Sequence, residues 1–236
     1  MTAFIFFLTY NDRTIPTPIR VLNDVKDLGV KNIGFKDVGI PKHRLVELKR
    51  AIDDAGFTSY LEVVSEDRES TLRGARIAAE LGVDRLIGSQ GQYTEDVMEI
   101  IKGTGIAFYP FVGSVCGIPS VLHGSIDEIV AEALEKQEMR VAGIDLLAYR
   151  HKENPEELME RVIEALEIPV IVAGSVNTLD RIRRVISAGA SAFTIGTAIF
   201  DTAIVPSGSL EDQVVAVVNE TEERRETGRT KGGCPC

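Results

Sequence analysis

Three charged residues interrupt apolar, strand-like runs of the sequence, and they are the first candidates for chemistry. Lys36 lies in "NIGFKD", Glu62 in "SYLEVV" and Asp145 in "GIDLLAY". In a sheet that closes on itself, successive side chains alternate between the interior and the covering helices. An unpaired charge against the dry helix layer is costly. We therefore expect all three side chains to point into the interior.

These residue types suit proton transfer next to a carbonyl group. Lys36 and Glu62 come from consecutive strand-like runs, and a lysine in a desolvated pocket is expected to have a lowered pKa. Such an amine can act as a base, an acid or the nucleophile that forms an imine, while Glu62 or Asp145 moves a proton. The alternative is a buried Lys36–Glu62 ion pair that only fills the interior.

Two later runs stop at a glycine followed by a hydroxyl residue. "PVIVAGSV" stops at Gly174 and Ser175, and "AFTIGTAIFD" stops at Gly196 and Thr197. Without a Cβ, the backbone can be approached by an anion, and successive N–H groups at the start of a short helix complement its charge. These four residues are therefore predicted to bind a phosphate group. The alternative is that both glycines serve close packing alone.

Strand-like and helical segments alternate along the whole chain. The strand-like runs are apolar at both odd and even positions, which indicates a parallel sheet covered on both faces. They occupy residues 3–10, 32–36, 59–64, 85–88, 106–112, 143–148, 169–173 and 192–195. Eight such units in 236 residues predict a single α/β domain, a (β/α)8 TIM barrel. A doubly wound sheet is the alternative, but no glycine-rich dinucleotide fingerprint follows the first run.

A barrel locates further candidates, because its active site lies at the C-terminal ends of the strands. Thr9, Asn11 and Ser89 fall at such ends and are candidates for hydrogen bonds to substrate hydroxyl groups. Arg150 follows the sixth strand and can hold a carboxylate or second phosphate through two parallel hydrogen bonds. Alternatively, Arg150 is a surface residue paired with an acidic helix. No residues are clustered at metal-ligand spacing, so no metal is expected.

The two glycine-hydroxyl strand ends resemble the last two units of the ribulose-phosphate-binding barrel superfamily. This superfamily includes isomerases and synthases of histidine and tryptophan biosynthesis and sugar-phosphate epimerases. The resemblance covers residues 169–201 and extends to the rest of the chain only in its eight-fold architecture. The resemblance implies a phosphate-binding site at these two strand ends. It also implies enolisation, isomerisation or carbon–carbon cleavage by lysine and carboxylate side chains.

The chain also departs from the branches of that superfamily. The paired "D-x-K-x-x-D" arrangement of the decarboxylase branch is absent around Lys36. The isomerase branch usually opens with an acid or a cysteine in its first strand, where this chain offers Thr9 and Asn11. No specific branch is identified by these residues.

Composition limits the partners of the protein. The formal net charge of -10 argues against nucleic-acid and anionic-membrane partners, which require a basic surface. No apolar run approaches the roughly 18 residues of a membrane span, and the first run lacks the features of a signal peptide. We expect a cytoplasmic protein that binds a small phosphorylated metabolite. A homo-oligomer is compatible with the sequence.

The predicted barrel occupies residues 1–225, and residues 226–236 are predicted to be a disordered tail. Cys116 stands alone, and Cys234 and Cys236 lie in the tail, so the three cysteines do not form a disulfide framework. Two cysteines in a C-x-C pair make a poor metal site by themselves.

The sequence therefore predicts an enzyme: a metal-independent isomerase, epimerase or aldolase-like lyase acting on a small phosphorylated carbonyl compound such as a sugar phosphate, with no cofactor. One alternative is a non-catalytic phosphate-binding or regulatory barrel, in which Lys36 and Glu62 pair permanently. Another is a flavin-dependent enzyme whose flavin phosphate occupies the same two strand ends.

Overall fold

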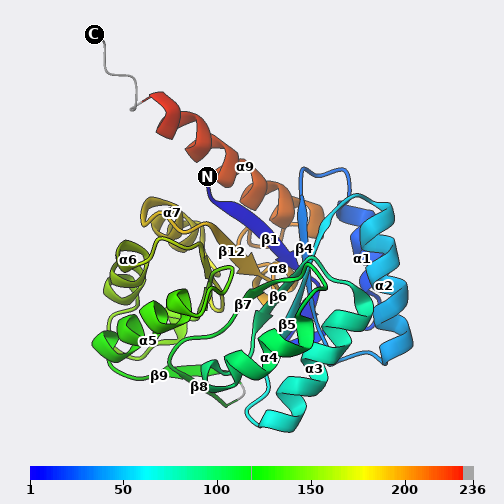
Figure 1. The fold of residues 1–236 in the computed structure, drawn as a ribbon. Coiled ribbons are helices and arrows are strands. Elements are labelled where there is room, and N and C mark those ends of the chain that lie inside the picture. The colour runs from blue at the N-terminus through cyan, green and yellow to red at the C-terminus, as the bar shows by residue number, and fades with distance from the viewer. Residues whose placement is uncertain (118, 231–236) are drawn as a thin grey trace.

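A computed structural model describes residues 1–117 and 119–230 of the chain. Its main sheet contains eight parallel strands in the order β10-β11-β12-β1-β4-β5-β6-β7 (Figure 1). The strands are β1 (Ala3–Phe7), β4 (Asn32–Lys36), β5 (Thr58–Val63), β6 (Arg85–Gly88), β7 (Ala107–Tyr109), β10 (Ile144–Leu146), β11 (Val170–Val172) and β12 (Ala192–Ile195). Each falls within or overlaps one predicted run, and the prediction of a TIM barrel is confirmed.

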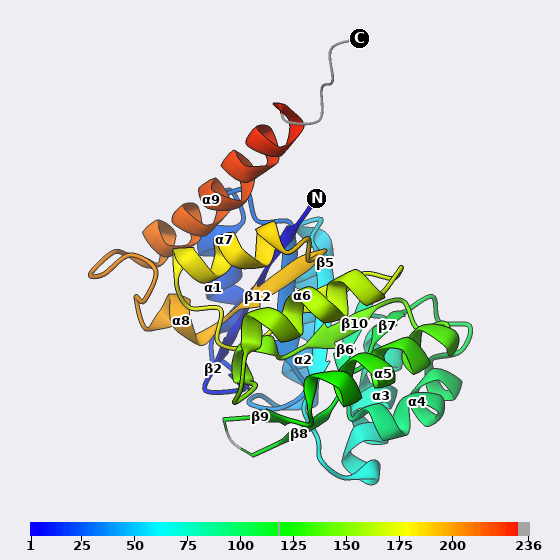
Figure 2. The same cartoon turned by 90° about the vertical axis from the view of Figure 1, so that its left-hand side faces the viewer.

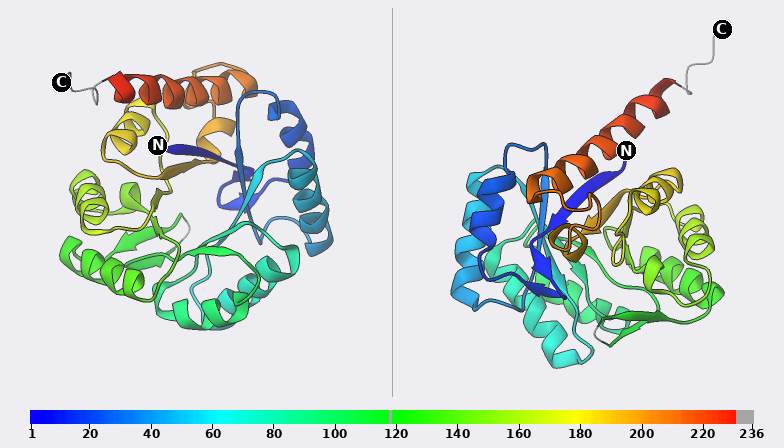
Figure 3. Two further views of the ribbon diagram at one scale, coloured as in Figure 1. Left: turned by 45° about the horizontal axis from the view of Figure 1, so that its top comes forward. Right: turned by 180° about the vertical axis from the view of Figure 1, so that it is seen from behind.

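The barrel closes between β7 and β10 by a short seam. An isolated parallel bridge pairs Phe111 with Asp145. The Ala142 N–H donates to the Phe108 carbonyl at 2.9 Å, and the Asp145 N–H donates to the Pro110 carbonyl at 3.0 Å. The left view of Figure 3 shows the resulting ring of strands inside a ring of helices.

Helices cover the outside of this ring. The longer ones are α1 (Pro18–Val25), α2 (Lys42–Asp54), α3 (Arg68–Leu81), α4 (Thr94–Ile101), α5 (Ile126–Glu138), α6 (Pro155–Ala165), α7 (Leu179–Ser187) and α9 (Leu210–Thr230). Short turns of helix follow three strands: η1 (Gly91–Tyr93), η2 (Ala148–Arg150) and α8 (Thr197–Phe200). Helix α9 runs past residue 225 and projects from the barrel (Figure 1). Residues 231–236, including Cys234 and Cys236, lie outside the described residues.

The side chains of the strands divide between two apolar layers, as the period of two requires. One layer packs outward against the helices. The other fills the barrel interior with Ile5, Phe7, Tyr60, Ile87, Tyr109, Ile171 and Ala192. Lys36 pairs in register with Glu62, two positions after Gly34 and Tyr60. Both charged residues therefore have the inward parity that the sequence predicts.

Two small hairpins stand at the C-terminal end of the barrel (Figure 2). The first pairs β2 (Thr9–Tyr10) with β3 (Arg13–Thr14), and the second pairs β8 (Ser114–Cys116) with β9 (Val121–His123). Neither hairpin is predicted from the sequence, because neither turn contains the Asn-Gly or Asp-Gly pair that usually signals one. They enclose the end of the barrel where the predicted site residues gather.

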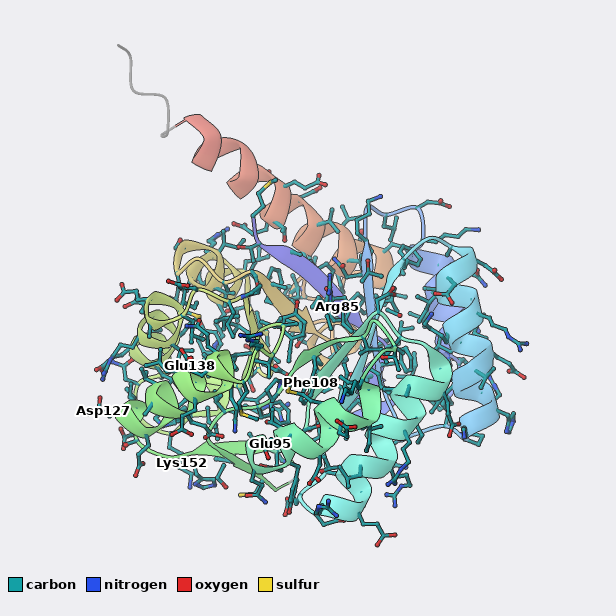
Figure 4. The ribbon with its side chains drawn as sticks, in the orientation of Figure 1. Arg85, Glu95, Phe108, Asp127, Glu138 and Lys152 are labelled. Atoms are coloured by element: carbon teal, nitrogen blue, oxygen red, sulfur yellow. The ribbon has the colours of Figure 1, made fainter. Side chains whose placement is uncertain are left out.

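The acidic residues responsible for the net charge lie largely on the outer helices. Glu95 on α4 and Asp127 and Glu138 on α5, all labelled in Figure 4, are exposed. Within the described part of the chain, no helix combines the length and apolarity needed to cross a membrane.

Candidate active site

A cavity of about 420 Å³ opens at the C-terminal ends of the strands. Most of the predicted site residues line it: Thr9, Asn11, Lys36, Glu62, Arg150, Gly174, Ser175, Gly196 and Thr197. Its volume is in the range of small-molecule sites. Two predicted site residues, Ser89 and Asp145, do not line the cavity.

Lys36 lies at the centre of an ion network in this cavity. Its Nζ atom is 3.2 Å from Glu62 Oε2 and 2.8 Å from Asp12 Oδ1. The side chains of Lys36 and Glu62 are 5% and 10% exposed, so both are almost completely desolvated. The predicted Lys36–Glu62 ion pair is present, but both residues also face the cavity. Lys36 and Glu62 can therefore stabilise the barrel interior as an ion pair and also act on a ligand in the cavity.

The protonation of Lys36 differs from the sequence-based expectation. Burial alone lowers the pKa of its ammonium group, but the Glu62 and Asp12 carboxylates outweigh burial and raise the pKa above its ordinary value. The expected lowered pKa is wrong, because the sequence did not indicate a second carboxylate beside Lys36. In this arrangement Lys36 is an ammonium ion rather than a free amine.

Asp12 is the main functional candidate that sequence reasoning missed. It lies at the tip of the β2–β3 hairpin and lines the cavity. Burial tends to raise the pKa of its carboxyl group, but Lys36 and Arg150 outweigh burial and lower that pKa. Its position directly after the first strand was the available signal. The hairpin that turns it back over Lys36 was not predicted.

Asp145 lies beneath the cavity floor. It is fully buried, and neither carboxylate oxygen forms a hydrogen bond of ordinary geometry with the described residues. Burial and the nearby Glu62 carboxylate raise its pKa well above the ordinary value, although Lys36 opposes that shift. The surroundings of Asp145 therefore favour its neutral form, and the residue is buried near Glu62 without lining the cavity.

Ser89 is also fully buried, and its Oγ atom has no hydrogen-bond partner among the described residues. The prediction that Ser89 contacts substrate is not supported by this position. Its φ of +72° turns the chain sharply at the end of β6.

Thr9 and Asn11 lie at the base and tip of the first hairpin. Thr9 is buried against the end of β12, where its Oγ1 atom would lie 2.5 Å from a Cβ placed on Gly196. The Asn11 N–H donates to Thr197 Oγ1 at 3.0 Å. The hairpin therefore connects the ion network with the strand ends predicted to bind phosphate.

Unpaired backbone N–H groups gather at the ends of β11 and β12. Several residues there line the cavity, and their N–H groups donate to no other described residue: Ser175, Val176, Gly196, Thr197 and Ala198. N–H groups in this arrangement form a site for a phosphate or carboxylate.

The reason for the two glycines differs from the one expected. A Cβ on Gly174 would lie 2.5 Å from Arg150 Nε, and a Cβ on Gly196 would lie 2.5 Å from Thr9 Oγ1. The space beside each glycine is therefore filled by protein, not left open to an anion. The glycines serve packing, and the case for an anion site depends on the unpaired N–H groups.

Further residues line the cavity without a distinct signal in the sequence, among them Phe7, Leu147, Val176, Asn177, Thr194, Ile195 and Asp201. Among the described residues, no group of three or more His, Cys, Asp or Glu side chains is arranged to hold a metal ion.

Comparisons with solved structures confirm the barrel fold. Orotidine 5'-phosphate decarboxylase from Pyrococcus horikoshii OT3 matches with a TM-score of 0.68 and 16% identity, covering 93% of this chain and 99% of that chain. N-acetylmannosamine-6-phosphate 2-epimerase from Clostridium perfringens matches with a TM-score of 0.62 and 14% identity, covering 96% and 93%. At these identities the likeness shows the fold.

A curated relative matches a shorter stretch. A phosphoribosyl-imidazole-carboxamide isomerase from Methanothrix thermoacetophila is 39% identical over 72 residues, which are 30% of this chain and 29% of the relative. Together with the solved structures, this match supports the resemblance to the ribulose-phosphate-binding barrels, and the fold of the chain is a TIM barrel.

A family model identifies the chain more narrowly. The model described as nitronate monooxygenase matches residues 59–234, more than half of the sequence. The chain belongs to the nitronate monooxygenase family.

Proposed function

We propose that this protein is a metal-independent isomerase or epimerase that enolises a small phosphorylated carbonyl compound. One observation carries the proposal: Lys36 is held between two carboxylates in the same cavity that the unpaired N–H groups of the last two strand ends line. The N–H groups would hold the phosphate, and the ion network would act on the carbonyl end of the substrate.

The protonation states favour enolisation over imine chemistry. An ammonium ion cannot attack a carbonyl carbon, but it can donate a hydrogen bond to the carbonyl oxygen and stabilise the negative charge that develops there. Glu62 would remove the proton from the adjacent carbon. An isomerase then returns it to the neighbouring carbon, whereas an epimerase returns a proton to the same carbon from the opposite face. Asp145, behind Glu62, would act on the reaction through that carboxylate. An aldolase-like lyase that forms an imine on Lys36 is the less favoured version.

Membership of the nitronate monooxygenase family favours a second candidate, because that family model describes a flavin-dependent barrel. The unpaired N–H groups fit a flavin phosphate as well as a sugar phosphate. A flat, uncharged ring in this cavity would have to share it with the charged side chains of Lys36, Glu62 and Asp12, which favours the smaller substrate. No step of the proposed reaction uses a flavin.

Thermal unfolding with a panel of ligands tests the proposal. The panel contains sugar phosphates, the same sugars without phosphate, inorganic phosphate, flavin mononucleotide and riboflavin. A ligand at about 100 times its dissociation constant adds about 2.7 kcal/mol to the free energy of unfolding. For a chain of this size, that corresponds to a rise in Tm of roughly 5–10 °C. Compounds that stabilise the protein then enter turnover assays.

A matched pair of variants locates the site. Ser175 has a φ of +58° and lines the cavity, and both Asn and Asp tolerate this conformation. We expect Ser175→Asp to abolish the shift by charge repulsion and Ser175→Asn to retain it. If no phosphorylated compound shifts the Tm of the wild type, the anion site is disproved. A shift with flavin mononucleotide alone would favour the flavin-dependent candidate.

A further inference from the structure

Arg150 is poorly satisfied for a largely buried arginine. Its terminal nitrogens lie 3.4 Å and 3.5 Å from the two carboxylate oxygens of Asp12, and 3.4 Å from the Ser120 carbonyl. Ordinary guanidinium–carboxylate hydrogen bonds measure about 2.7–2.9 Å. Its Nε atom is buried and has no partner among the described residues. Three long contacts therefore hold a group that offers five N–H donors.

This guanidinium lies directly beside the predicted anion site. Its Nε atom would be 2.5 Å from a Cβ placed on Gly174, at the end of β11. Arg150 also lines the cavity together with Ser175 and Thr197. A small movement of the side chain would therefore bring its unused donors to an anion held by the N–H groups of those two strand ends.

Asp12, the present partner of Arg150, has a left-handed backbone conformation that aspartate tolerates. It has a φ of +60° and follows Asn11, which has a φ of +48°, in the two-residue turn of the first hairpin. Such turns favour glycine at the second position. Aspartate at this position instead supplies a carboxylate at the tip of the hairpin. That carboxylate contacts both Lys36 and Arg150.

We propose that Arg150 is exchanged between Asp12 and the anionic group of the ligand. In the structure Asp12 holds the guanidinium loosely. Binding of a phosphate at Ser175 and Thr197 draws Arg150 onto the phosphate and away from Asp12. The inference rests on the proposed phosphate site and adds a regulatory property to it, because the ligand's own phosphate releases a carboxylate beside Lys36.

The exchange has a chemical consequence. Arg150 is one of the two cations that hold the Asp12 carboxyl group in its ionised form. When Arg150 leaves, the basicity of Asp12 rises, and a second potential base faces the carbonyl end of the ligand. An unphosphorylated analogue leaves the Asp12–Arg150 contact in place. Phosphate would thus promote proton transfer as well as binding.

A double-mutant cycle with inorganic phosphate as the probe tests this inference. Its dissociation constant is measured by isothermal titration for the wild type, Asp12→Asn, Arg150→Gln and the double variant. Asn suits the left-handed turn position, so the first variant is expected to fold. We expect Asp12→Asn to tighten phosphate binding by about fivefold or more, and Arg150→Gln to weaken it. In the Arg150→Gln background, Asp12→Asn should give no gain.

A matched control separates exchange from general electrostatics. Asp201 carries a carboxylate in the same cavity but makes no hydrogen bond to Arg150 among the described contacts. Asp201→Asn should change phosphate affinity equally in the wild-type and Arg150→Gln backgrounds. A gain from Asp12→Asn that persists without Arg150 would come from Lys36 or from net charge, and it would overturn the inference.

Two further outcomes are decisive in different ways. Equal phosphate affinity in the wild type and Asp12→Asn overturns the exchange but leaves the anion site intact. No phosphate binding in any variant disproves the proposed function, and the exchange with it. If Arg150→Gln unfolds in the absence of phosphate, Arg150→Lys replaces it in the cycle, because lysine keeps the charge but cannot make the same paired contacts.

Discussion

The fully buried Asp145 shows how burial at a single residue sets its protonation. Neither of its enclosed oxygens forms a hydrogen bond of ordinary geometry with the described residues, and Glu62 is close by. Burial and this neighbour raise the pKa of Asp145 well above its ordinary value. The protonated form that this raised pKa favours does not repel the neighbouring Glu62 carboxylate.

This protonation predicts a dependence of stability on pH. In the unfolded chain, Asp145 ionises near pH 4, whereas the folded protein retains the proton to higher pH. Between the two pKa values the folded state binds more protons, so the contribution of Asp145 to the free energy of unfolding falls as the pH rises. Asp145→Asn mimics the protonated acid and removes this fall. Its Tm relative to wild type should increase from about pH 4 to pH 8.

Asp24→Asn serves as the control, because Asp24 is exposed on α1. Its Tm difference from wild type should be small at every pH, as for most surface substitutions. A Tm difference for Asp145→Asn that stays constant between pH 4 and pH 8 would contradict a protonated Asp145.

Strand parity predicted the inward-facing charges but not their full environment. Lys36 and Glu62 lie where the period of two places them. Asp12 was missed because it comes from a turn, and turns carry no comparable periodicity. Without Asp12, burial was expected to lower the pKa of Lys36. In the structure, the Asp12 and Glu62 carboxylates together raise it. The sequence therefore identified the site residues that lie in strands, but not Asp12, which lies in a turn.

At the scale of elements, the tight contact between η2 and the end of β11 predicts the effect of a side chain on Gly174. Gly174 has a φ of +70°, and a Cβ there would displace Arg150. Gly56 has a φ of +74° but nothing lies within 4 Å of the corresponding position. Gly56→Ala therefore measures the cost of the left-handed backbone alone, about 1–2 kcal/mol.

We expect Gly174→Ala to lower the free energy of unfolding by at least about 1 kcal/mol more than Gly56→Ala, since Arg150 must also move. It should also change the affinity for inorganic phosphate, which Gly56→Ala should leave unaltered. Denaturant unfolding and titration calorimetry measure the two effects. Equal stability losses in both variants would show that Arg150 shifts at no cost, and that the contact with Gly174 does not position it.

The elements themselves were largely predictable, because each barrel strand lies in a mostly apolar run and the long helices other than α9 have an amphipathic pattern. The hairpins were not, because β2–β3 turns through Asn11 and Asp12 instead of a glycine pair. These unpredicted hairpins bring together residues from distant parts of the chain. The site was consequently predicted as a set of strand ends, without the contacts that connect them.

For the whole molecule, the weakest part of the ring of strands is the seam between β7 and β10. The β4–β5 ladder runs from Asn32–Thr58 to Lys36–Glu62, whereas the seam contains one isolated bridge. Pro110 lies in the seam and has no N–H to contribute. Local opening should therefore occur there at a lower free energy than elsewhere in the barrel.

Hydrogen exchange measured by mass spectrometry tests this order. Peptides that contain Ala142 to Asp145 should be protected at least about tenfold less than peptides from β5, a difference of about 1.4 kcal/mol in opening free energy. Opening also exposes Asp145 to water, and its ionisation favours the open state. The protection of the seam amides should therefore fall as the pH rises, even after correction for the pH dependence of intrinsic exchange. Asp145→Asn should remove this additional pH dependence. Uniform protection around the ring would mean that the barrel opens only by global unfolding, and that Asp145 gains no access to solvent through the seam.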